Sequence, residues 1–75
     1  MPHEIYRIET IASQAAGGEL IRRRMVRAES VEAAKTVAQR IFTLARRPHA
    51  GGPEVASVRL LNGAGYELFS ISVDD

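Results

Sequence analysis

The 75-residue sequence contains no cysteine and no tryptophan, and no aspartate precedes Asp74. Without cysteine the chain can form neither a disulfide nor a thiolate metal site, and it suits a reducing compartment such as the cytosol. A domain this small buries only about 60% of the surface that its unfolded chain exposes, so its stability must come from the core or from self-association. We therefore expect a single domain, residues 1–75, that forms a homodimer.

Histidine and long apolar runs are equally scarce. His3 lies near the start and His49 in a connection rich in proline and glycine, and the glutamates fall at positions expected to be exposed. Isolated histidines and solvated carboxylates provide neither three metal ligands nor a general base, so we expect no enzyme, no metal and no cofactor. No segment approaches the ~18 apolar residues of a membrane span, and the start lacks a secretory signal, which predicts a cytoplasmic protein.

The segment from Ser30 to Arg47 has the pattern of one amphipathic helix. At about 100° per residue its apolar side chains fall on one arc and its charged side chains on the rest. Ser30 is a favourable N-cap, and Pro48 ends the helix because it lacks an N–H and clashes with the preceding turn. One helix with one apolar stripe covers only one face of a sheet, which leaves the other face to solvent or a partner. The apolar arc consists of Ala34, Val37, Ala38, Ile41, Leu44 and Ala45.

Four segments around this helix have the composition and alternation of β-strands. Residues 13–18, with paired glycines, indicate one hairpin turn, and residues 62–65, Asn-Gly-Ala-Gly, indicate a second. The Gly-x-Gly in the second turn does not predict a phosphate site, since no helix follows it. We predict an α+β fold in which a four-stranded, mainly antiparallel sheet has one helix packed on one face, in the order ββαββ. The predicted strands are Glu4 to Ala12, Glu19 to Ala28, Glu54 to Leu61 and Tyr66 to Val73.

The alternation also predicts which side chains face the helix. In the first strand Arg7 and Glu9 point outward, and the inward set is Tyr6, Ile8, Thr10 and Ala12. In the last hairpin a turn of two or four residues groups the apolar side chains on one face, whereas a three-residue turn would invert one strand against the other. That inward set is Ala56, Val58, Leu60, Phe69, Ile71 and Val73. Neither face of the second strand is clearly apolar, which indicates a bulge or an edge position.

Arginine supplies nine of the ten basic residues, although the net charge is only +1. A strand rich in arginine could bind the phosphates of RNA or single-stranded DNA. Sheets that bind single strands usually add aromatic rings, and only Tyr66 falls on the open face. The alternative is an edge strand whose charges prevent aggregation and pair with glutamates across strands. The candidate polyanion-binding residues are Arg7, Arg22, Arg23, Arg24, Arg27 and Arg59.

A small apolar group provides a second candidate surface. Leu61, Tyr66 and Leu68 fall on the open face of the last hairpin, and Phe42 lies at the margin of the helix stripe. Several exposed apolar side chains on an uncovered sheet are typical of a protein interface. The alternative is that these residues only pack around the turn.

Two segments carry a resemblance to known proteins. The passage from Glu29 to Ala34 and the hairpin from Val58 to Glu67 resemble small uncharacterised proteobacterial proteins of strand-strand-helix-strand-strand type. This resemblance implies a fold and no activity. The first half is also similar to antitoxins of the HicB kind, in which a strand pair precedes a helix opened by Ser-x-Glu-Ala, here Ser30 to Ala33, but this chain lacks their DNA-binding extension after the helix.

Taken together, these patterns predict a non-enzymatic protein-interaction module. We expect its partner to be a second copy of the chain or another protein, bound through the uncovered sheet face or an exposed edge strand, and we expect no membrane partner. The alternative function is RNA or single-stranded DNA binding through the arginine-rich strand.

Overall fold

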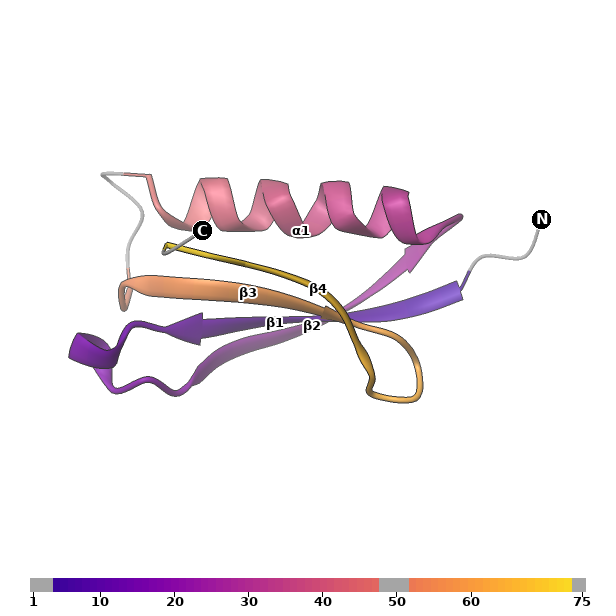
Figure 1. The fold of residues 1–75 in the computed structure, drawn as a ribbon. Helices are drawn as coiled ribbons and strands as arrows, with labels where there is room; N and C mark the ends of the chain where they lie inside the picture. The colour runs from indigo at the N-terminus through magenta and orange to yellow at the C-terminus, as the bar shows by residue number, and fades with distance from the viewer. Residues whose placement is uncertain (1–3, 48–51, 74–75) are drawn as a thin grey trace.

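The computed structural model describes residues 4–47 and 52–73, which form one four-stranded sheet and one long helix on one of its faces (Figure 1). The elements are β1 (Glu4–Ala12), the short 3₁₀ helix η1 (Gln14–Ala16), β2 (Leu20–Ala28), α1 (Val31–Ala45), β3 (Val55–Leu61) and β4 (Glu67–Ser72). All neighbouring strands are antiparallel, in the order β2-β1-β3-β4. The predicted fold class is confirmed. His3 and the predicted connection at Pro48 and His49 lie outside the described residues.

The helix α1 begins where the capping signal predicts. Ser30 has extended backbone, and its hydroxyl accepts a hydrogen bond from the Ala33 N–H at 3.1 Å. Ala34 and Ala38 are completely buried against the sheet, because a methyl side chain lets the helix axis come close to the strands. The helix ends at Ala45, two residues before the predicted end at Arg47.

Replacing the cap, Ser30→Ala, is expected to lower the free energy of unfolding by about 1 kcal/mol, because an early helix N–H loses its acceptor. Urea denaturation at a fixed protein concentration measures this loss. Thr36→Ala is the matched control: the Thr36 hydroxyl donates to the Glu32 carbonyl within the helix, and alanine has the higher helix propensity. A Ser30→Ala variant as stable as Thr36→Ala would contradict the capping role.

The core lies between α1 and the two central strands. The predicted inward set of β1 is confirmed, since each of its four side chains is at most 6% exposed. In β3, Val58 and Leu60 are completely buried, and in β4 Phe69 and Ile71 pack against them while staying partly exposed. The predicted burial of Val73 is wrong, because β4 ends at Ser72 and α1 lies mainly over β3, so Val73 is 46% exposed. Ala56, also predicted to face inward, is only partly buried: the register against β1 shifts there, and Val55 pairs with Ala12 and lies in the core at 5% exposure.

The last hairpin has a three-residue turn, and not the two or four residues predicted. The Asn62 N–H donates to the Tyr66 carbonyl at 2.9 Å, which leaves residues 63–65 in the turn, with Gly65 at φ 90°. The register then shifts: Leu61 pairs with Glu67, whereas Leu60 pairs with Phe69. The extra residue is Leu68. This bulge offsets the inversion that the odd turn would cause and returns the apolar side chains to the helix side.

The bulge or edge position predicted for the second strand is confirmed on both counts. β2 is an edge strand, and its register against β1 shifts where Thr10 pairs with Arg22 but Ile11 pairs with Leu20. Ile21 is therefore the extra residue of a bulge. Beyond the bulge, the pairing of Ile8 with Arg24 places an arginine on the helix side of the sheet.

Candidate functional site

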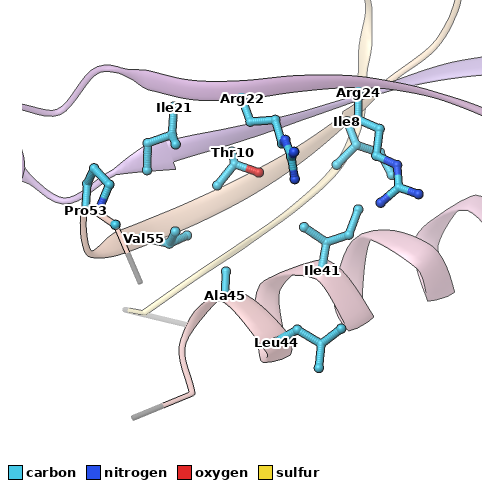
Figure 2. A pocket seen from close by; sticks show the side chains of 11 residues that line it. Ile8, Thr10, Ile21, Arg22, Arg24, Ile41, Leu44, Ala45, Pro53 and Val55 are labelled. Atoms are coloured by element: carbon cyan, nitrogen blue, oxygen red, sulfur yellow. The ribbon is translucent and has the colours of Figure 1, made fainter. Parts of the chain in front are cut away.

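A groove of about 410 Å³ lies between the edge strand β2 and the C-terminal half of α1 (Figure 2). It exists because α1 lies mainly over β3 and leaves this side of the sheet partly uncovered. Figure 2 shows the side chains of Arg22 and Arg24 extending from β2 toward the helix. Apart from these two arginines, the walls of the groove are largely apolar. The remaining lining residues are Ile8, Thr10, Ile21, Ile41, Leu44, Ala45, Gly52, Pro53 and Val55.

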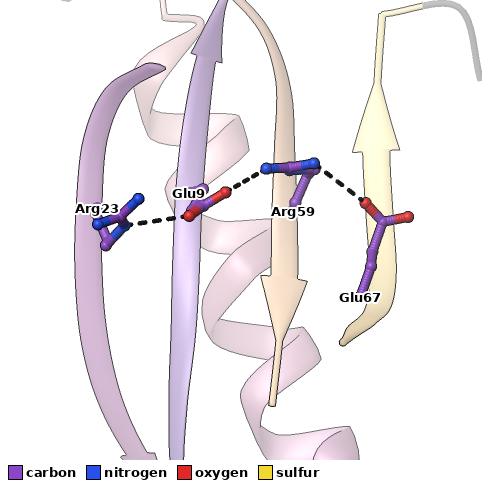
Figure 3. A network of polar contacts seen from close by, with 4 residues as sticks. All are labelled: Glu9, Arg23, Arg59 and Glu67. Carbon is purple, nitrogen blue, oxygen red and sulfur yellow. Dashed lines mark hydrogen bonds and ion pairs between the residues drawn. The ribbon is translucent and has the colours of Figure 1, made fainter. Parts of the chain in front are cut away.

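A row of charged side chains crosses the open face, which we define as the face of the sheet that α1 does not cover (Figure 3). Each strand contributes one residue, with alternating sign: Arg23, Glu9, Arg59 and Glu67. The Arg23 Nε donates to one Glu9 oxygen at 3.1 Å, and the Arg59 guanidinium donates to the other. The second Arg59 nitrogen lies 3.9 Å from the Glu67 carboxylate. The row thus links all four strands.

Glu9 is buried at the centre of this row, at 4% exposure, although the alternation predicts only that it faces outward. Arg23 and Arg59 close over it from the two neighbouring strands. The hydrogen bond from Arg59, assisted by the one from Arg23, holds the pKa of Glu9 below its ordinary value of 4.5, although burial acts in the opposite direction. The expected pairing of arginines with glutamates across strands is therefore present here.

Within the part of the chain that the structure describes, Tyr6 also has a shifted pKa. The Tyr6 hydroxyl donates to the Glu4 carboxylate at 3.2 Å. Burial raises the pKa of Tyr6, and the nearby Glu4 charge adds to the effect. Tyr6 is therefore neutral at physiological pH and serves as a core side chain whose hydroxyl has a partner.

The structure divides the six candidate arginines between two faces. Arg22 and Arg24 lie opposite Thr10 and Ile8, on the helix side. The other four lie on the open face, namely Arg7, Arg23, Arg27 and Arg59. Within residues 4–47 and 52–73, Arg22 and Arg24 form no ion pair. The arginines of β2 thus do not form one continuous basic surface.

The predicted apolar group is not one exposed patch. Leu61 lies on the open face opposite Arg7 but is only 6% exposed, so its predicted exposure is wrong. Tyr66 and Leu68 are exposed, at 72% and 38%. Phe42 lies away from them, on α1, where it packs at the margin of the core beneath the Arg46 guanidinium. Only Tyr66 and Leu68 remain as neighbours on an accessible surface.

The two edge strands differ sharply in charge. β2 carries four arginines among its nine residues, whereas no charged residue occurs between Leu68 and Val73 in and after β4. Charged side chains on an edge strand oppose its pairing with another chain. The edge at β2 is therefore protected and the edge at β4 is not. Sequence reasoning missed this contrast because the strand order was unknown.

Comparisons with protein-family models, with curated proteins and with solved structures find no match for this chain. The resemblances drawn from the sequence stay predictions. Among the described residues, no group of three or more histidine, cysteine, aspartate or glutamate side chains is placed to hold a metal ion. In the same part of the chain, no helix combines the length and the apolar character that crossing a membrane requires.

Proposed function

We propose that this chain is a cytoplasmic, non-enzymatic interaction module that forms a homodimer through the free edge of β4. The observation that carries the proposal is the uncharged run from Leu68 to Val73 on an edge strand. An apolar edge without charge or proline is a template for pairing with another strand. Self-pairing of β2 would instead bring eight arginines together, four from each copy, and like charges across strands are destabilising.

The backbone of β4 supports this pairing. The Val73 N–H donates to the Ala56 carbonyl at 3.0 Å. Ile71 and Phe69, two and four residues earlier in the chain, therefore occupy the other hydrogen-bonded positions against β3. In an antiparallel ladder the intervening residue directs its N–H and C=O away from the partner strand. For Ser70 that direction is the free edge. A second β4 running antiparallel would meet a donor and an acceptor there.

The side chains of β4 support it as well. Phe69 and Ile71 are only partly buried, and Val73 is 46% exposed, because one helix does not extend fully over this edge. In an antiparallel β4 pair the two helices lie on the same side of a continuous sheet. The apolar side chains of both copies would then cover one another, with Leu68 and Tyr66 close to the start of the strand.

The nucleic-acid alternative has less support. A platform for single strands needs several cations and stacking rings on one accessible surface. The six candidate arginines lie on two faces, and Arg23 and Arg59 are already paired with Glu9. The open face is also a poorer candidate for the dimer interface than the edge of β4, because a row of charged side chains crosses it.

Sedimentation equilibrium tests the dimer. We expect the wild type to dimerise with a dissociation constant in the low micromolar range, and Ser70→Lys to weaken the dimer by about tenfold or more, since it places a charge on the unprotected edge. Ser70→Pro removes the N–H donor at the free edge and is expected to leave only monomer at the same concentration.

The matched control is Met25→Lys, which adds the same charge to the other edge strand at a residue that is 58% exposed. Its dimerisation should equal that of the wild type. A wild-type monomer at high micromolar concentration would refute the homodimer. A dimer that Met25→Lys weakens and Ser70→Lys does not would assign the interface to β2 instead.

A further inference from the structure

We propose that the groove between β2 and α1 binds a small amphipathic carboxylate, that is, a molecule with an apolar chain that ends in one carboxylate group. The groove lies at the sheet edge opposite β4, so this inference does not depend on the proposed dimer. Its volume of about 410 Å³ falls within the range of roughly 300–1,000 Å³ that is usual for small-molecule sites.

Two guanidinium groups define the charge of the ligand. Arg22 and Arg24 stand two residues apart on β2, so their side chains leave the strand on the same face, and Figure 2 shows both directed at the helix across the groove. Neither forms an ion pair within the described residues. Arginine presents donors in a planar fork that matches a carboxylate, so an anion between the two side chains would satisfy them both.

The Thr10 hydroxyl gives a second polar contact. Thr10 is 6% exposed and lies at the floor of the groove beside Arg22. No hydrogen bond within residues 4–47 and 52–73 involves its hydroxyl. The hydroxyl oxygen is not sealed from solvent, unlike the unpartnered Nε atoms of Arg7 and Arg59, so it is open to a ligand in the groove. A carboxylate held by Arg22 and Arg24 would lie within reach of Thr10 and could accept a hydrogen bond from its hydroxyl.

The rest of the groove defines the apolar part of the ligand. Ile41 and Leu44 of α1 and Ile21 of β2 line it, and both Leu44 and Ile21 are exposed to solvent, at 45% and 38%. An apolar chain laid along these side chains would remove them from water. An inorganic anion would leave these apolar side chains exposed to water, and an uncharged chain would leave the two exposed guanidinium groups bound only by water. Only a molecule with both parts satisfies the whole groove.

Decanoate is the probe, titrated into ¹⁵N-labelled protein while amide chemical shifts are recorded. We expect saturable binding with a dissociation constant on the order of 0.1–1 mM, and shifts concentrated at Ile41, Leu44 and Val55. The double variant Arg22→Gln/Arg24→Gln is expected to weaken binding by about tenfold or more, because both charge-assisted hydrogen bonds are lost. Decanol, which has the chain without the charge, should bind more weakly by about tenfold or more, because it has no carboxylate for the two guanidinium groups to bind.

The matched control is Arg27→Gln, which removes one charge from the same strand on the opposite face. It should bind decanoate as the wild type does. A second variant, Ala45→Phe, fills the groove from the helix side and should abolish binding while the arginines remain. The proposal is overturned if decanoate does not saturate, if decanol binds equally well, or if Arg27→Gln weakens binding as much as the double variant.

Discussion

Leu60→Ala is expected to lower the free energy of unfolding by about 3 kcal/mol, within the range of roughly 2–5 kcal/mol for buried leucines. Leu60 is completely buried on β3, the central strand that α1 mainly covers. Truncation removes apolar contacts and leaves a cavity that the flanking strands cannot readily close, because a pleated sheet holds their spacing. For a chain this small, such a loss is a large part of its whole stability.

Urea denaturation at one fixed protein concentration measures the effect, since a dimer would make stability depend on concentration. Leu44→Ala is the matched control, because the same atoms are removed from a helix residue that is 45% exposed. Its cost should stay below about 1 kcal/mol, as little apolar surface returns to water and alanine favours the helix. Equal costs for the two variants would contradict the placement of the core beneath α1.

The sequence predicts the elements of this fold because they rest on local signals. The alternation of β1 identifies its buried side chains without reference to any other strand, and the Ser30 cap marks the start of α1. The second strand illustrates the limit of that reasoning. Its four arginines look alike in the sequence, and only the register against β1 separates Arg22 and Arg24 from Arg23 and Arg27. Register is a long-range property, so no local pattern supplies it.

The open face shows the same limit in its electrostatics. The alternation predicts the outward direction of Glu9 but not its burial, because the residues that cover it lie 14 and 50 positions away in the chain. In the last hairpin, a bulge in β4 compensates for the odd length of the turn. A three-residue turn and the bulge at Leu68 each shift the pairing by one residue, and together they restore the predicted faces of Val58, Leu60, Phe69 and Ile71. The bulge cannot be predicted from the turn residues alone, because it is defined by the register of β4 against β3.

Replacing both cations over Glu9 by apolar side chains, Arg23→Met/Arg59→Met, is expected to lower the free energy of unfolding by about 2–3 kcal/mol at pH 7. The variant keeps the Glu9 carboxylate largely covered but removes both of its charged partners, which leaves a desolvated charge uncompensated. Urea denaturation of the two proteins at several pH values measures the difference.

The pH dependence of this difference identifies its cause. In the wild type the pKa of Glu9 is lowered, so its stabilising contribution is present above pH 4.5 and is lost as the pH falls through the folded-state value. In the double variant burial acts alone and raises that pKa. The destabilisation is then largest at neutral pH and decreases as Glu9 takes up a proton on the way down to pH 4.5. The stability gap between the two proteins should therefore narrow on acidification.

Adding Glu9→Gln to the double variant separates charge from packing. Glutamine has nearly the same shape as glutamate and no charge, so the triple variant should recover most of the lost stability at pH 7. Between pH 7 and pH 4.5, the difference in stability between the triple variant and the wild type should no longer narrow. If the double variant is as stable as the wild type at pH 7, the carboxylate does not depend on its two arginines. If its deficit is the same at every pH, the loss comes from the packing of the arginine side chains and not from the charge that they neutralise.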